Sequence, residues 1–133
     1  MNHRTVIQQF YHEIWNKLDK GRIPALCHPD FSFRGSLGQT KRGHAGFADY
    51  VDFVTAALGD YRCDIQETIC EGDKAFAKVL FSGVHRGEFF GYPPTQKRVE
   101  WIGAAVFTFA DGKIADLWVL GDVHGLIQQL AGE

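Results

Sequence analysis

The chain has 133 residues, of which 45% are hydrophobic and 23% charged, values that favour one folded domain and leave too little length for two. A net charge of -2 provides no strong field toward nucleic acid or anionic lipid. The longest apolar stretch, Trp101 to Ala110, is too short to span a bilayer, and the first residues show no signal-peptide core. We therefore expect a cytoplasmic single domain over residues 1–133 that binds neither nucleic acid nor membrane.

Helical patterns dominate the first part of the chain. Apolar residues recur at helical steps over residues 3–20, which predicts an amphipathic helix that stops at Gly21. Pro24 to Cys27 predicts a short helical turn, Phe31 to Phe33 a strand, and the glycine-rich residues 35–46 a loop. A second helix is predicted from His44 to Leu58, ended by Gly59-Asp60.

Strand patterns follow from Tyr61 to Leu120, and we expect the strands to pair antiparallel. Glu71-Gly72-Asp73 and Asp111-Gly112 indicate tight hairpins, and residues 87–96 form a longer connection. The last strand, Lys113 to Gly121, leads into a short helix from Val123 to Leu130. Helices followed by a meander predict an α+β fold with helices packed on one face of a curved antiparallel sheet.

Asp122 is the most interesting acid in the sequence. A period of two places it on the same strand face as Trp118 and Leu120. Apolar neighbours would desolvate its carboxyl and suit it to general acid or base catalysis. Asp122 also precedes a predicted helix, where aspartate is a preferred N-cap. Both roles are compatible with the spacing.

His85 shares the parity of Val79 and Phe81, so we expect it on the apolar face of its strand. There it could orient or protonate a substrate oxygen, or be a satisfied interior histidine. The six histidines and three cysteines show no metal-ligand spacing, so we expect no metal.

Aromatic residues make up 14% of the chain, and they either fill the core or line a cavity for a flat, ringed molecule. The candidates for ligand contact are Trp15, Phe33, Phe53, Phe89, Trp101 and Trp118. Phe90 is a further aromatic residue that could line such a cavity.

Several motifs together resemble one family. They are Phe10-Tyr11-x-Glu13-x-Trp15-Asn16, Pro29-Asp30-Phe31, Gly43-His44-x-Gly46, Gly83-x-His85-x-Gly87-Glu88-Phe89-x-Gly91-x-Pro93-Pro94-Thr95, Asp111-Gly112-Lys113-Ile114, Trp118 with Asp122 four residues later, and Gln129-Leu130. In this order and spacing they resemble the SnoaL-like polyketide cyclases over almost the entire chain.

The resemblance implies a cone-shaped α+β barrel of the nuclear transport factor 2-like type, shared with ketosteroid isomerase, with the N-terminal helices over the concave face. It also implies that the aspartate matching Asp122 is the acid/base of an intramolecular aldol ring closure, without metal or cofactor. Polyketide cyclases pair that aspartate with a histidine on the preceding strand, whereas Val106 to Phe109 contains none. His85 is the candidate to replace it.

Two hypotheses follow. The first is a cofactor-free cyclase or isomerase that encloses a hydrophobic carbonyl compound in an apolar pocket, with Asp122 as base and His85 assisting. The second is a non-catalytic small-molecule-binding or dimerisation module, in which Asp122 faces solvent or caps the last helix. Because the open sheet face of this fold usually packs against a partner, we also expect a homodimer. The alternating residues Val99, Trp101, Ala105, Phe107 and Phe109 are the expected apolar patch.

Overall fold

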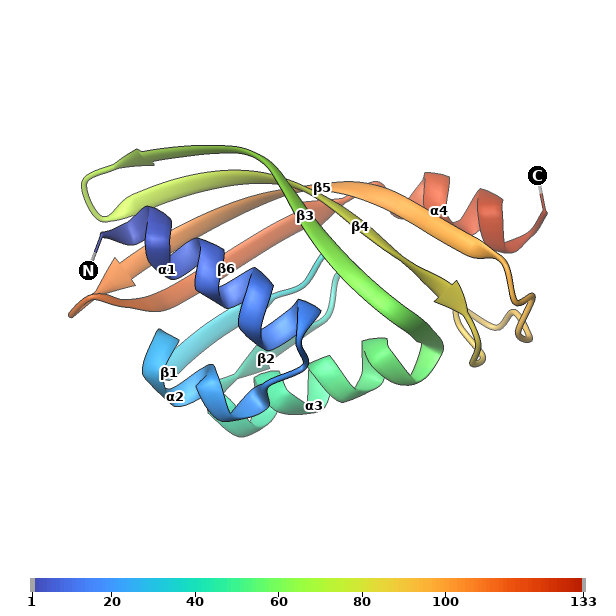
Figure 1. Cartoon of the computed structure of the whole chain (residues 1–133), viewed down its shortest axis with the longest axis horizontal. Coiled ribbons are helices and arrows are strands. Elements are labelled where there is room, and N and C mark those ends of the chain that lie inside the picture. The colour runs from blue at the N-terminus through green and yellow to red at the C-terminus, as the bar shows by residue number, and fades with distance from the viewer. Residues whose placement is uncertain (1, 133) are drawn as a thin grey trace.

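A single curved sheet organises the molecule, and a computed structural model describes it over residues 2–132 (Figure 1). Its strands are β1 (Cys27–Arg34), β2 (Thr40–Arg42), β3 (Leu58–Glu71), β4 (Lys74–His85), β5 (Arg98–Ala110) and β6 (Lys113–Gly121). They lie side by side in the order β2-β1-β6-β5-β4-β3. β3, β4, β5 and β6 form an antiparallel meander, whereas β1 pairs with β6 in parallel.

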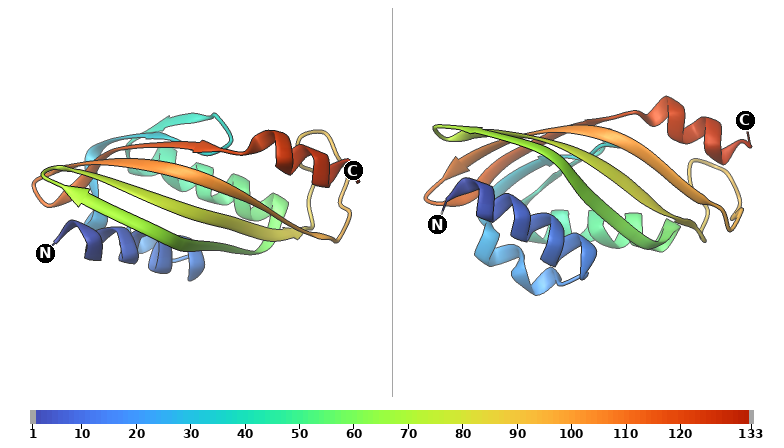
Figure 2. Two further views of the ribbon diagram at one scale, coloured as in Figure 1. Left: turned by 90° about the horizontal axis from the view of Figure 1, so that it is seen from above. Right: turned by 45° about the horizontal axis from the view of Figure 1, so that its top comes forward.

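The N-terminal helices cover the concave side of this sheet (Figure 1). They are α1 (His3–Gln9), the π-helical segment η1 (Phe10–Asn16), the 3₁₀ turn η2 (Lys20–Arg22), α2 (Ile23–Leu26) and α3 (Gly43–Ala57). α4 (Val123–Leu130) lies at the end of the sheet away from the N-terminus (Figure 2). The predicted α+β class, with helices over the concave face of a curved sheet, is confirmed, and the sheet is not closed into a barrel.

The first helix differs most from its prediction. It ends at Asn16, and its second half is π-helical. Leu18, which the apolar periodicity included, adopts a positive φ of 56° and is exposed. Residues past Asn16 leave the sheet surface, so the helical pattern has nothing left to bury against.

Three further boundaries differ from the prediction. The loop predicted over residues 35–46 contains β2, and α3 begins within it at Gly43. α3 passes directly into β3 at Leu58, because the Gly59-Asp60 pair lies inside the strand instead of ending the helix. The bounds predicted for β6 and α4 agree with the structure.

Alternation along the long strands separates a buried concave face from an outer convex face. Val99, Trp101, Ala105, Phe107 and Phe109 all face the core. The expectation that these five residues supply an external apolar patch is therefore wrong, because β5 presents the opposite parity outward. Ile102 and Val106 are the large apolar residues that β5 exposes on that side.

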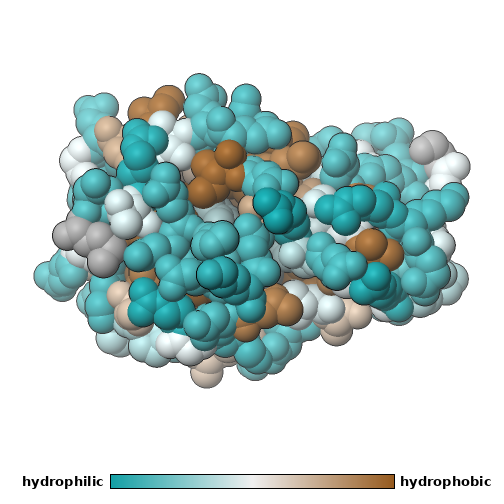
Figure 3. Space-filling view, in the orientation of Figure 1, coloured by the Kyte–Doolittle hydropathy of each residue, from teal (hydrophilic) through white to brown (hydrophobic). Residues whose placement is uncertain are grey.

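The remaining surface is largely polar. In the view of Figure 3, hydrophobic side chains appear as small separate groups among hydrophilic ones. Among residues 2–132, no helix combines the length and hydropathy needed to cross a membrane.

Candidate functional site: an aromatic cavity inside the sheet

The concave side of the sheet and the helices enclose a small cavity. Its volume is about 20 Å³, room for about one water molecule. None of the described residues that line it is charged; they are Phe10, Tyr11, Trp15, Phe33, Ser36, Tyr50, Tyr61, Phe81, Leu117 and Val119. A ringed ligand therefore does not fit without displacing aromatic side chains, contrary to the preformed enclosed pocket that the sequence led us to expect.

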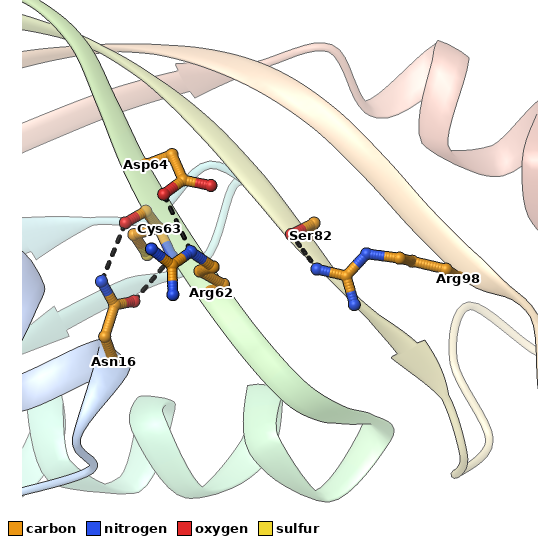
Figure 4. Close-up of polar contacts among 6 residues, drawn as sticks. All are labelled: Asn16, Arg62, Cys63, Asp64, Ser82 and Arg98. Carbon is orange, nitrogen blue, oxygen red and sulfur yellow. Dashed lines mark hydrogen bonds and ion pairs between the residues drawn. The ribbon is translucent and has the colours of Figure 1, made fainter.

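Segment η1 brings three lining residues to the cavity, Phe10, Tyr11 and Trp15. Asn16 is the last residue of η1, and its side chain forms hydrogen bonds with β3 (Figure 4). The Asn16 amide donates to the Cys63 carbonyl at 2.9 Å and accepts from the Cys63 N–H at 2.7 Å. Both bonds use backbone groups on the free edge of β3, the last strand of the sheet. The position of η1 is thus fixed by a paired amide contact as well as by packing.

Most polar groups at the cavity have partners. Trp101 Nε1 donates to Ser36 Oγ at 3.2 Å. The Tyr50 hydroxyl oxygen receives hydrogen bonds from Ser36 and from the Leu37 backbone, and the Tyr61 hydroxyl donates to the Cys63 sulfur. The Tyr11 hydroxyl is buried and has no partner.

Burial sets the protonation of these groups. It raises the pKa of Tyr11 well above its ordinary value, with a smaller contribution from Cys63. Burial likewise raises the pKa of Tyr50, although the hydrogen bonds from Ser36 and Leu37 oppose the shift. The pKa of Tyr61 is raised by burial first and by Cys63 second. Tyrosine is protonated at neutral pH even without such a shift, and the raised pKa keeps all three hydroxyls protonated, and able to donate hydrogen bonds, at higher pH as well.

Two glycines allow the turn after β1 to enter the interior. A Cβ on Gly35 would lie 2.4 Å from the Tyr50 hydroxyl, and one on Gly121 would lie 2.8 Å from Ser36 Cβ. A larger residue at Gly35 would displace the Tyr50 hydroxyl, and one at Gly121 would displace Ser36. These close approaches explain why Ser36, a residue of a surface turn, is buried.

The structure divides the six predicted ligand-contact aromatics. Trp15 and Phe33 line the cavity, and Trp101 lies behind Phe81 with ring centroids 5.5 Å apart. Phe53 and Phe89 pack together at 6.3 Å outside the cavity lining.

Trp118 lies outside the cavity altogether. It is 43% exposed on the convex face, beneath the Arg34 guanidinium at 5.4 Å. Its predicted place at an enclosed site is wrong, because Trp118 and Leu120 point outward from β6 while Leu117 and Val119 point inward.

Asp122 shares the face of Trp118 and Leu120, as the spacing predicted, but that face is the outer one. Its side chain is exposed and accepts a hydrogen bond from the Gly125 N–H at 3.0 Å, which makes it the N-cap of α4. The expectation of a desolvated carboxyl within an apolar cavity is wrong. A catalytic role for Asp122 stays a prediction based on the resemblance.

His85 is fully buried on the concave side of β4, as its parity predicted. Its Nδ1 accepts from the Thr95 N–H at 3.3 Å and lies 3.1 Å from Thr95 Oγ1. In the neutral tautomer this leaves the proton on Nε2, which has no partner. His85 thus anchors the connection between β4 and β5. It is not part of the cavity lining, and the structure does not bring it together with Asp122.

The described interior of β5 and β6 also lacks a substitute acid or base. The inward residues Leu117 and Val119 of β6 and Ala105 and Phe107 of β5 are all apolar. Within residues 2–132, no group of three histidine, cysteine or carboxylate residues could hold a metal ion.

Sequence reasoning missed Ser36, Tyr50 and Tyr61 and singled out Tyr11 only as part of a motif. Tyr11 and Tyr50 lie on the buried faces of amphipathic helices, so a search for hydroxyls within apolar stripes would have found them. Ser36 gave no such signal, since its burial depends on contacts with Gly121 and Trp101.

Comparisons with known proteins agree on one family. The model of the SnoaL-like polyketide cyclases matches residues 5–130. No curated protein is detectably similar in sequence.

Solved structures resemble the chain over nearly its whole length. A candidate polyketide cyclase from Acidithiobacillus ferrooxidans is 25% identical with a TM-score of 0.86, and the match covers 99% of both chains. IdmH from Streptomyces antibioticus, a candidate polyketide cyclase, is 24% identical with a TM-score of 0.84 over 96% of this chain and 97% of its own. TsrD from Streptomyces laurentii is 24% identical with a TM-score of 0.86, over 100% and 99%. With a family match over most of its length and the same curved sheet beneath its helices, this chain belongs to the SnoaL-like polyketide cyclase family.

Proposed function

We propose that this protein is a cofactor-free cyclase or isomerase that acts on a neutral, hydrophobic carbonyl compound. The family supports the reaction class. The observation that carries the substrate class is the uncharged aromatic lining of the cavity, since a charged ligand there would lose its hydration without gaining a counter-ion.

Aldol-type cyclisation and double-bond isomerisation share a first step, in which a base takes a proton from the carbon next to a carbonyl and the electron pair of that C–H bond moves to the carbonyl oxygen. The base is the Asp122 carboxylate in one form of the proposal and a hydroxide or buffer base from solvent in the other. A water-poor site favours this step when it stabilises the negative charge that develops on the carbonyl oxygen. Protonated, buried hydroxyls are suitable donors for that purpose, and burial keeps the tyrosines of this cavity protonated by raising the pKa of each.

Proton exchange tests the shared step without knowledge of the natural substrate. We expect the protein to accelerate deuterium incorporation next to the carbonyl of 2-tetralone in D₂O, followed by NMR without added metal or cofactor. A rate equal to that of buffer, under conditions where the ketone is bound, would refute the enzymatic proposal.

Asp122→Asn separates two forms of the proposal. Asparagine caps a helix as well as aspartate does, so this variant removes the carboxylate and leaves α4 capped. Because the exposed carboxyl is bonded to Gly125 and lies outside the cavity lining, we expect exchange to persist. Its loss, with the fold intact, would support Asp122 as the acid/base. His85→Gln in the same assay tests the predicted assisting role of His85.

A second candidate function, ligand binding without catalysis, is favoured by the position of Asp122 outside the cavity. It predicts that 2-tetralone changes the fluorescence of Trp15 and exchanges no faster than in buffer. The two functions therefore give different results in one pair of measurements.

Cavity size provides a control for where the ketone binds. Leu117→Ala removes part of the cavity wall, whereas Leu26→Ala removes a leucine that is equally buried elsewhere. Each change should cost about 2–5 kcal/mol of stability. We expect only Leu117→Ala to tighten 2-tetralone binding, and equal effects of the two variants would contradict binding in this cavity.

A further inference from the structure

One wall of the cavity differs from the others in its access to solvent. Among the described residues that line the cavity, Tyr61 of β3 is the only one that is partly exposed, and all the others are buried. The lining strands β1, β4 and β6 each have a neighbouring strand on both sides, whereas β3 is the last strand of the sheet. The cavity therefore comes closest to solvent at Tyr61, on a strand that is bonded to the sheet along one edge only.

The backbone around Tyr61 is irregular. The register of β3 against β4 shifts between Gly59 and Arg62, where β3 contains one residue more than β4. Such a β-bulge leaves a residue outside the regular ladder, and bulges are frequent next to functional sites. Asp60 has a positive φ of 50°, which is uncommon for a residue other than glycine. This stretch of β3 is thus held less firmly than the regular strands on which the other lining residues lie.

Two contacts hold the same stretch against the helical layer. The Tyr61 ring packs on the Trp15 ring of η1, with the centroids 5.2 Å apart. Two residues further along β3, Cys63 is bonded through both of its backbone groups to the Asn16 amide, at 2.9 and 2.7 Å (Figure 4). Asn16 is not among the residues that line the cavity. Its hydrogen bonds therefore hold η1 and β3 together without contact to a ligand.

A cavity of about 20 Å³ has room for about one water molecule, so a ringed ligand enters only if one of the walls moves. We propose that Tyr61 is the gate of this cavity and that the Asn16–Cys63 amide pair keeps the gate closed. When the pair opens, the bulged stretch of β3 moves away from η1, and the ligand enters between Trp15 and Tyr61. Local openings that need far less free energy than global unfolding are common in proteins. The gate rests on the proposed function only for the class of ligand that passes it.

The test compares two matched amide pairs. Asn16→Ala breaks the pair at the gate. Gln129→Ala breaks the equivalent pair on β5, where the Gln129 amide accepts from the Glu100 N–H at 2.9 Å and donates to the Glu100 carbonyl at 2.7 Å. The association and dissociation rates of 2-tetralone are measured for the wild type and both variants by stopped-flow tryptophan fluorescence.

A second measurement follows the opening without a ligand. In a Trp118→Phe background the remaining tryptophans are Trp15 and Trp101, which are 4% and 3% exposed. Quenching of their fluorescence by acrylamide, a small neutral molecule, then depends on openings of the interior. The quenching constant is compared between this background and the same background with Asn16→Ala or Gln129→Ala.

We expect both rates of 2-tetralone to rise about tenfold in Asn16→Ala, because the loss of two hydrogen bonds increases the fraction of molecules with an open gate. Entry and exit use the same gate, so Kd should change by less than about twofold. Acrylamide quenching should increase in parallel. Gln129→Ala should leave the rates and the quenching unchanged. Asn16→Asp keeps the acceptor for the Cys63 N–H and should give a smaller increase than Asn16→Ala.

Unchanged rates in Asn16→Ala, an equal increase in Gln129→Ala, or a change in Kd carried by the dissociation rate alone would each overturn the gate. If 2-tetralone does not bind the wild type, the quenching still tests the gate. Quenching that rises in Asn16→Ala and not in Gln129→Ala supports it, and equal quenching in both overturns it. Failure of the proposed function has a different signature, in which the rates respond as expected and the deuterium exchange of 2-tetralone stays at the rate of buffer.

Discussion

Buried hydroxyl and thiol groups give the interior of this protein its sensitivity to alkali. Burial raises the pKa of Tyr11 and Tyr61, and it raises the pKa of Cys63 despite the opposing hydrogen bond from Tyr61. It also raises the pKa of Cys27 to about 12, partly offset by Lys113. The folded state therefore holds protons that the unfolded chain releases.

The direction of these pKa shifts predicts how stability varies with pH. In the unfolded chain, cysteine and tyrosine ionise at about pH 8.5 and 10, respectively. The stabilisation that these groups contribute is therefore fully present below that range and is lost as the pH rises through it. We expect the urea concentration at the midpoint of unfolding to fall steadily between about pH 8.5 and 11. In Cys63→Ala, the fall at the lower end of this pH range should be smaller. A midpoint that is constant up to pH 11 would contradict the buried state of these groups.

Asp122 contributes to stability through a single local contact. Replacement by alanine removes the hydrogen bond to the Gly125 N–H and should cost about 1 kcal/mol of unfolding free energy. Asparagine preserves the bond and should be nearly neutral. Urea unfolding of the two variants checks the difference, and equal losses would mean that the charge stabilises α4 and the hydrogen bond does not.

For single residues, the sequence correctly predicted which side chains share a strand face, but it did not predict whether that face is buried or exposed. Period-two counting correctly placed Asp122 with Trp118 and His85 with Phe81. It could not show that the first face is the convex surface, because both faces of β6 carry apolar residues. Tyr11, Ser36 and Tyr50 meet only through tertiary contacts, which no local pattern records.

Among the secondary-structure elements, two amide side chains form hydrogen bonds with backbone groups on exposed strand edges. Asn16 bonds to both backbone groups of Cys63 on β3. Gln129 of α4 does the same to Glu100 of β5, accepting at 2.9 Å and donating at 2.7 Å, where β5 extends beyond its pairing with β6. Unpaired strand edges invite association with other chains, and these amides satisfy them within the monomer.

Asn16→Ala tests this role. Two partly buried hydrogen bonds are lost, and we expect a cost of about 2 kcal/mol in unfolding free energy. Amide exchange at Cys63 should also become faster. Asn16→Asp keeps the acceptor for the Cys63 N–H, so it should protect that amide better than alanine does. A loss below about 0.5 kcal/mol would mean that packing alone holds η1 against β3.

The elements that the sequence predicted well are those set by neighbouring residues. The hairpins at Gly72 and Gly112 follow from glycines at positive φ, and the bounds of β6 and α4 follow from strand alternation and the Asp122 cap. The π-helical form of η1 could not be predicted, because α- and π-helices bury similar stripes of residues. The parallel pairing of β1 with β6 joins segments about 85 residues apart and leaves no local signal.

At the scale of the whole molecule, the convex face of the sheet carries rows of apolar residues, with Lys78 among them. Ile69, Phe76, Val106 and Trp118 lie directly opposite one another across β3, β4, β5 and β6. Ala104 and Leu120 form a second row, and Leu80 and Ile102 a third. We call these eight residues the outer apolar band. Ile69 is 58% and Leu120 53% exposed, and a band of this kind is typical of a surface that associates with a partner.

The sequence already led us to expect a homodimer through the open sheet face, and the structure changes which residues would form it. A second copy is a suitable occupant because a twofold axis would place each outer apolar band against its equal.

We expect the wild type to sediment as a dimer at micromolar concentration. Val106→Lys should dissociate it, because Val106 lies within the first row of the band and two lysines would meet near the axis. Gln66→Lys, on an exposed position of β3 outside the band, should leave the dimer intact. A wild-type monomer would mean that this face stays open to solvent. Equal effects of the two variants on a wild-type dimer would mean that it forms through a contact other than the outer apolar band.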